Sequence, residues 1–148
     1  MKILSIPNEN GKMTCFWEEG ASSGKKPLII CLADKEEDAQ RDLNLLFSQA
    51  NGASVAALVI YPQTEEQIVG DWLYSLRQRE DVDENRITLT GTLSAADWVW
   101  RLGSHFPQWF AGICAVGGYG DPYEVRAMKN VPVRAYLVEE EPQIIRWQ

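Results

Sequence analysis

The sequence predicts an α/β protein built around a mostly parallel sheet, and three observations support this. Continuous apolar segments such as 27–33 and 54–61 are typical of strands that are buried on both faces. Between such segments, apolar residues recur at three- and four-residue spacing, as they do in helices that cover a sheet. A hairpin signal near the N-terminus adds an antiparallel pair at one edge. We therefore expect one domain that spans residues 1–148.

The composition is that of a globular protein, with 45% hydrophobic and 24% charged residues among 148. The net charge of -7 disfavours nucleic acid and anionic membranes as partners. No apolar run approaches the roughly 20 residues of a membrane span, and the N-terminal run is too short for a signal peptide. Cys15, Cys31 and Cys114 are scattered, which indicates buried thiols in a reducing compartment. We expect a cytoplasmic protein of bacterial type that holds no metal or cofactor.

The first third of the chain predicts a hairpin, a buried strand and a helix. Met1–Pro7 and Lys12–Glu19 are strand-like, and an Asn-Gly pair between them supplies the positive φ of a hairpin turn. Pro27–Ala33 is continuously apolar and predicts a strand of a parallel sheet. Glu36–Ala50 has the apolar spacing of a helix that packs against such a sheet.

The next segments repeat the same alternation of strand and helix. Ser54–Tyr61 is a second buried strand. Thr64–Gln67 has the sequence of a capping box, so a helix is expected to begin there. That helix carries an apolar stripe that includes Trp72, which predicts that this tryptophan is buried.

Residues 86–100, RITLTGTLSAADWVW, organise the rest of the sequence. The strand Ile87–Thr90 is followed by a tight turn at Gly91 and by a helix with Trp98 on its buried face. Strand, sharp turn and helix are the geometry of a nucleophile elbow, in which the motif G-x-S-x-G presents a serine above a sheet. With Gly91 as the first glycine of that motif, Leu93 stands at the nucleophile position.

The last elements predict an exposed edge of the sheet. Phe110–Gly118 is a further strand, Asp121–Glu124 begins a short helix with Asp as its cap, and Val131–Val138 is the last strand. Proteins seldom leave a long edge strand bare. We therefore expect either Ile144–Trp147 to fold back over this edge or a second subunit to form a homodimer through it.

Several segments resemble one family. Asp81–Gly91, DVDENRITLTG, resembles the approach to the elbow in α/β-hydrolase esterases of the dienelactone-hydrolase and phospholipase/carboxylesterase branch. Segments 61–63, 100–111, 117–122 and 130–133 are similar to sequences before and after that elbow. The resemblance implies a three-layer sandwich with an N-terminal antiparallel hairpin and strands in the order 1-2-4-3-5-6-7. It also implies a fold shortened by the family's last strand and last helix.

Acyl transfer on this fold requires a nucleophile, a base, an acid and an oxyanion hole. Leu93 has no atom that attacks a carbonyl. Ser94 begins the following helix, where we expect a helix cap or an exposed hydroxyl. His105 is the only histidine, and a helix from Ser94 would place it roughly 16 Å from the elbow. No intact catalytic set is therefore predicted.

The resemblance assigns two further vestigial positions. Glu141 stands at the acid position, and Ala33-Asp34 stands where the family has His-Gly in the oxyanion loop. An aspartate in that loop repels a developing oxyanion, and the repulsion grows in a water-poor site. Both departures argue against a working serine hydrolase.

Ligands of open α/β sheets bind beyond the carboxyl ends of the strands. The segments expected there form an acidic pocket, which would suit an amine or a divalent cation with oxygen ligands. The candidate ligand-binding residues are Asp34, Ser94, Tyr119, Asp121, Glu139 and Glu141.

The leading functional hypothesis is a catalytically inactive relative of α/β-hydrolase esterases that acts as a binding or interaction module for a small ligand or a protein partner. The alternative is a carboxylic-ester hydrolase that uses Ser94 with Glu141, or that receives a histidine from another chain. A third hypothesis is a structural or oligomeric protein with no closed pocket and a large apolar interface.

Overall fold

The structure is a computed structural model that describes residues 2–4, 13–61, 64–118 and 126–136. Its strands form one seven-stranded sheet in the order β1-β2-β4-β3-β5-β6-β7, which confirms the expected order. The strands are β1 (Lys2–Leu4), β2 (Met13–Glu18), β3 (Lys26–Ala33), β4 (Ser54–Ile60), β5 (Val82–Thr92), β6 (Gly112–Val116) and β7 (Val133–Tyr136). The helices are α1 (Glu36–Ser48), α2 (Glu66–Arg77) and α3 (Ser94–His105), with the 3₁₀ turns η1 (Pro107–Trp109) and η2 (Arg126–Met128).

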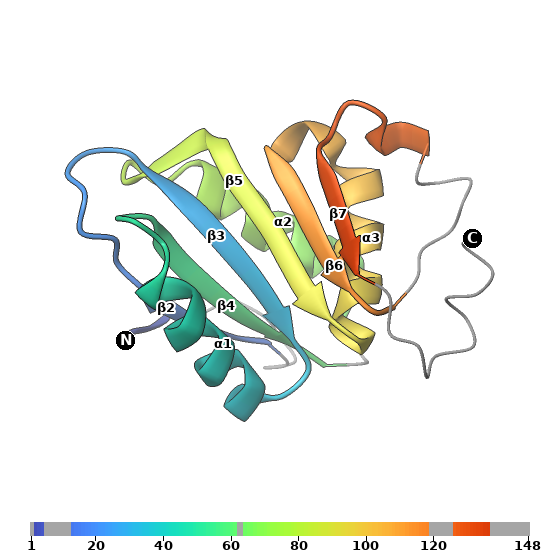
Figure 1. Ribbon diagram of the computed structural model, residues 1–148, viewed down its shortest axis with the longest axis horizontal. Helices are drawn as coiled ribbons and strands as arrows, with labels where there is room; N and C mark the ends of the chain where they lie inside the picture. The colour runs from blue at the N-terminus through green and yellow to red at the C-terminus, as the bar shows by residue number, and fades with distance from the viewer. Residues whose placement is uncertain (1, 5–12, 62–63, 119–125, 137–148) are drawn as a thin grey trace.

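The sheet is mixed, as the sequence predicts. β1 is antiparallel to β2, β2 is antiparallel to β4, and the remaining neighbours are parallel. Helix α1 covers one face, over β2, β3 and β4, and α2 and α3 lie on the other face (Figure 1). The described residues thus form the α/β sandwich that the resemblance implies.

The alternation of side chains along β3 explains why both faces of the sheet must be covered. Leu28, Ile30 and Leu32 belong to the core beneath α2 and α3, whereas Cys31 and Ala33 belong to the core beneath α1. Every residue of β4 is buried. Continuous apolar runs in the sequence therefore mark the central strands, because both faces of such a strand contact a helix layer.

The second helix begins within the expected segment Thr64–Gln67. Helix α2 begins at Glu66, and its N-cap residue is Glu65, which makes no side-chain capping hydrogen bond. The amide of Thr64 donates to the carbonyl of Tyr61 (2.9 Å). The capping box with Thr64 as its first residue stays a prediction.

Strand β5 is longer than Ile87–Thr90, the predicted strand. It runs through Gly91, so this glycine continues the strand and the reversal comes at Leu93. Trp72 is buried as expected, but Trp98 is only half-buried: it packs against the core, and the guanidinium of Arg101 lies over its ring.

The cysteines are free thiols, as expected. Burial raises the pKa of Cys15 and of Cys31 to about 12, whereas Cys114 is half-buried. The predicted helix at Asp121–Glu124 and the segment Ile144–Trp147 lie outside the described residues. Within the described residues, none of the helices combines the length and the apolar character that crossing a membrane requires.

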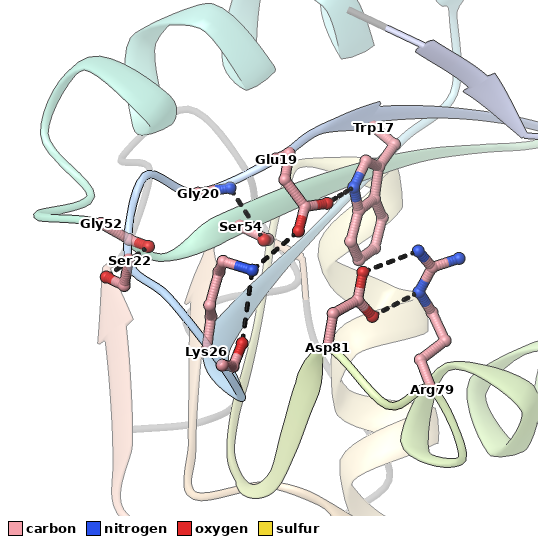
Figure 2. A network of polar contacts seen from close by, with 10 residues as sticks. Trp17, Glu19, Gly20, Ser22, Lys26, Gly52, Ser54, Arg79 and Asp81 are labelled. Atoms are coloured by element: carbon pink, nitrogen blue, oxygen red, sulfur yellow. Dashed lines mark hydrogen bonds and ion pairs between the residues drawn. The ribbon is translucent and has the colours of Figure 1, made fainter.

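A polar network ties the β2–β3 connection to the segment that precedes β5 (Figure 2). The ammonium of Lys26, a 7% exposed residue, donates to Glu19 (2.9 Å), which also accepts a hydrogen bond from the indole of Trp17 (2.7 Å). Arg79 lies over the Trp17 ring and forms two hydrogen bonds to Asp81, both of 2.9 Å. This network lies where parallel strands begin, at the end of the sheet away from the elbow.

Candidate functional site

The candidate site is centred on the elbow between β5 and α3. Leu93 lies between the two elements with φ 53° and ψ −121°, a combination that L-residues rarely adopt. Its amide donates to the carbonyl of Val116 at the end of β6 (2.7 Å), and its carbonyl accepts from the amide of Ala96 (2.9 Å). These two hydrogen bonds hold the reversal in place. Leu93 is 51% exposed, so its apolar side chain projects from the apex.

Two glycines allow the chain to pack closely around this apex. A Cβ on Gly91 would lie 2.9 Å from Val99 Cγ2 and 3.1 Å from the carbonyl oxygen of Ala95, so only glycine lets α3 approach the strand. A Cβ on Gly118 would lie 2.8 Å from the carbonyl oxygen of Leu93, and this glycine has a φ of +66°. Gly91 therefore lets α3 pack closely against β5 at the elbow, although it does not form the turn itself.

The structure brings two of the predicted site residues together. Asp34 follows β3 and Ser94 begins α3, and the hydroxyl of Ser94 donates to Asp34 Oδ2 at 2.7 Å. The strands β3 and β5 are neighbours in the sheet, so their carboxyl ends place these side chains at the same edge. The N-cap of α3 is Leu93, and it makes no side-chain cap, so the prediction of Ser94 as a helix cap is wrong. The alternative of an exposed hydroxyl is correct.

His105 lies where the sequence predicts it, at the far end of α3. Its Nδ1 is 2.7 Å from Glu66 Oε1, at the start of α2. A helix of this length separates His105 from Ser94 by roughly 16 Å. The imidazole therefore has a carboxylate neighbour, but it does not reach the hydroxyl at the elbow.

The remaining predicted site residues take no part in the described contacts at the elbow. Ala33 is buried at the end of β3. The part of the chain that the structure describes holds no cluster of three or more side chains of the metal-binding types His, Cys, Asp and Glu. The proposed amine or cation pocket stays a prediction, because four of its six residues lie outside the described ranges: Tyr119, Asp121, Glu139 and Glu141.

Sequence reasoning did not identify Gly118 and Val116 as parts of the elbow. Gly117 and Gly118 both have positive φ, and the Gly-Gly pair was the available signal. A Gly-Gly pair marks a special backbone but not its neighbour in space. The hydrogen bond between Leu93 and Val116 depends on the pairing of β5 with β6 and could not be read from local sequence.

The side chains at this edge offer few groups for catalysis. Leu93 offers a hydrocarbon contact, and the hydroxyl of Ser94 is bonded to a carboxylate. A carboxylate is a weaker base than an imidazole by about two to three pKa units in model peptides, so it draws a proton from a hydroxyl less effectively. The described residues at this edge do not form a catalytic triad.

No protein-family model matches the sequence, and no curated protein matches it. Solved structures do match. A thermostable esterase superposes with a TM-score of 0.73 at 19% identity, over 88% of this chain and 43% of that chain. A 2,6-dihydroxy-pseudo-oxynicotine hydrolase superposes with a TM-score of 0.66 at 15% identity, over 82% of this chain and 38% of that chain. A candidate dienelactone hydrolase from Klebsiella pneumoniae subsp. pneumoniae gives 0.61 at 14% identity, over 99% of this chain and 89% of that chain.

The chain thus spans less than half the length of the first two structures and most of the third. At these identities the matches establish the fold and leave activity open. They bear out the resemblance carried by residues 81–91. Strand order, the elbow at Leu93 and these structural matches together show that the described residues have the α/β-hydrolase fold.

Proposed function

We propose that this chain is a non-hydrolytic member of its fold class that binds a small ligand or a protein partner at the elbow edge. One observation carries the proposal: an exposed leucine holds the strained backbone conformation at the apex. Backbone strain of this kind costs about 1–3 kcal/mol and persists where the surrounding structure imposes it. An apolar side chain there serves contact and cannot serve nucleophilic attack.

A second candidate function, ester hydrolysis, is favoured by the hydrogen bond between Ser94 and Asp34 and by the esterases among the structural matches. In this case Ser94 acts as a displaced nucleophile, with Glu141 or with a histidine from another chain. The two candidates differ in one measurable property, which is turnover that depends on the Ser94 hydroxyl.

The experiment measures hydrolysis of p-nitrophenyl acetate by the wild type, by Ser94→Ala and by Ser48→Ala, an exposed serine at the end of α1 that serves as a matched control. We expect the three rates to agree within about twofold, since removal of a true catalytic group costs factors of a thousand or more. A tenfold or larger loss confined to Ser94→Ala would establish the hydrolase instead.

Ligand binding at the elbow edge, the other part of the proposal, is measured by thermal unfolding. Calcium, magnesium and spermidine are added in turn, and the melting temperature is compared between the wild type and Asp34→Asn. A cation held at the elbow raises the wild-type melting temperature and loses this effect when the Asp34 charge is removed, because ligands stabilise only the state they bind. A melting temperature unmoved by all three removes the cation as the ligand of this edge.

A further inference from the structure

A cleft lies between α2 and the segment that follows α3, away from the elbow. It has a volume of about 250 Å³. Five of its lining residues form one stripe of α2; of the other two, Phe106 precedes the turn η1 and Trp109 is its last residue. The lining residues are Glu66, Gln67, Gly70, Asp71, Tyr74, Phe106 and Trp109.

Aromatic rings form one wall of this cleft. Phe106 stacks on Trp109 with ring centroids 4.4 Å apart, and Tyr74 is tilted against Trp109 at 6.2 Å. Gly70 makes room for this cluster, since a Cβ there would lie 3.2 Å from Phe106 Cζ. Tyr74 is more than half exposed, so part of its ring surface is open to a ligand.

Carboxylates provide the charge of the cleft. Glu66 contacts His105, and Asp71 accepts a hydrogen bond from Gln67 at 3.0 Å. Among the described residues, the cleft lining includes no lysine or arginine. The neighbouring basic groups, Arg77 and His105, each lie against a carboxylate, Glu84 and Glu66. A cation in the cleft would gain from Asp71 and from the negative faces of the rings, whereas an anion would be repelled by Asp71.

The protein already places one cation on this aromatic cluster. The guanidinium of Arg77 lies 5.3 Å from the centroid of the Trp109 ring, and its charge is partly balanced by Glu84 at 3.7 Å. This contact shows that the indole accepts a cation in the folded protein. The overall charge of -7 adds a long-range field of the same sign.

We propose that the cleft lined by Tyr74, Phe106, Trp109, Glu66 and Asp71 is a binding site for an organic ammonium ion with an apolar body. The rings contact the alkyl groups that carry the positive charge, and the carboxylates set the sign of the ligand. A quaternary or alkylated ammonium fits better than a metal ion, because three of the seven lining residues are aromatic and their ring carbons are not metal ligands. This site is independent of the elbow.

Choline and its neutral isostere 3,3-dimethyl-1-butanol test the proposal by NMR titration, with the Trp109 indole N–H and the Gly70 amide as reporters. We expect choline to bind with a Kd of about 1 mM and the neutral isostere at least tenfold more weakly, as a cation–π contact with a carboxylate nearby requires. Equal affinity for the two compounds, or shifts absent from both reporters, would overturn the assignment.

Variants localise the effect. Asp71→Asn and Tyr74→Leu change exposed side chains of α2 and should each weaken choline about fivefold. Glu37→Gln, which removes the charge of an exposed carboxylate on α1 away from the cleft, is the matched control and should leave the Kd unchanged. Choline affinity that falls with Asp34→Asn but survives Asp71→Asn would place the cation at the elbow and refute this site.

A third compound distinguishes the two sources of such a cation. An N-acetylated trimethyllysine amide carries the same ammonium group on a peptide backbone. Binding of choline alone assigns the cleft to a free small molecule, and tighter binding of the lysine derivative assigns it to a side chain of a partner protein. Either result supports the ammonium site, and failure of both cations refutes it.

Discussion

Leu93 shows how strain and exposure act on one residue. Replacing it with glycine removes the cost of a positive φ, about 1–3 kcal/mol, but loses the half of the side chain that is buried and adds freedom to the unfolded chain. These effects oppose each other, so we predict that Leu93→Gly changes the free energy of unfolding by less than about 0.5 kcal/mol. Urea denaturation measures this value.

Leu45→Gly is the matched control, because Leu45 is 59% exposed and lies within α1 with ordinary helical geometry. The same substitution there relieves no strain and should cost about 1.5 kcal/mol, from glycine's poor helix propensity and from lost contact. Equal losses at the two positions would show that the Leu93 backbone is not strained.

At the residue scale, the sequence predicted which residue stands at the apex of the elbow better than it predicted which side chains contact each other. The register from Gly91 located Leu93 at the apex, which the backbone geometry confirms. The bond between Ser94 and Asp34 was not predicted, because it joins residues sixty positions apart in sequence through the pairing of two strands. Local sequence predicts the backbone path, whereas side-chain partners depend on the assembled sheet.

At the scale of elements, the connection between β2 and β3 depends on the buried ammonium of Lys26 and its partner Glu19. Hydrogen bonds from Lys26 and from Trp17 hold the pKa of the Glu19 carboxyl below its ordinary value. A lowered pKa stabilises the fold at pH values above the unfolded pKa, near 4.3, and this stability is lost as the pH falls through the folded value. The bidentate hydrogen bond from Arg79 lowers the pKa of Asp81 in the same direction.

We therefore predict that Glu19→Gln lowers the free energy of unfolding at pH 7 by about 1–2 kcal/mol, less than for a fully buried pair because Glu19 is partly exposed to solvent. The difference from the wild type should shrink below pH 4, where the wild-type carboxyl also becomes protonated. Chemical denaturation at pH 7 and pH 3 measures both values. Glu80→Gln, at an exposed position, is the control, and an equal loss for the two variants would contradict this role for Glu19.

Sequence patterns identified the elements more reliably than their ends. The apolar runs identified β3 and β4 because their burial on both faces leaves a strong hydrophobic signal. The polar stretch 20–26 has the composition of a loop, although Lys26 is buried and begins β3. Its burial depends on Glu19 and on the Gly24 carbonyl, contacts that composition does not reveal.

For the whole molecule, the two faces of the sheet are covered unequally. Helix α1 contacts β2, β3 and β4, and none of the described helices covers the same face of β5, β6 and β7 (Figure 1). A cleft of about 680 Å³ lies there, between Leu46 of α1 and Arg134 of β7. β7 is also the last strand of the described sheet, and all four of its residues are exposed. The predicted edge at Val131–Val138 is therefore present, with β7 described from Val133.

An edge with unpaired backbone groups next to an open face is a site for pairing. Strand β6 already binds the β7 amides that face it, so the amides on the outer edge report on a cover. We predict that these outward-facing amides exchange slowly with deuterium because the edge is covered in solution. Light scattering then separates the two predicted covers: about twice the monomer mass indicates a second subunit, and the monomer mass indicates cover by residues 144–147 of the same chain.

Where a dimer forms, Tyr136→Lys should return the mass to that of the monomer, whereas Tyr74→Lys, on α2, should not. Tyr136 and Tyr74 are similarly exposed, at 52% and 55%, so the pair separates position from added charge. A monomer whose outward-facing β7 amides exchange at the rate of an open chain would contradict both covers.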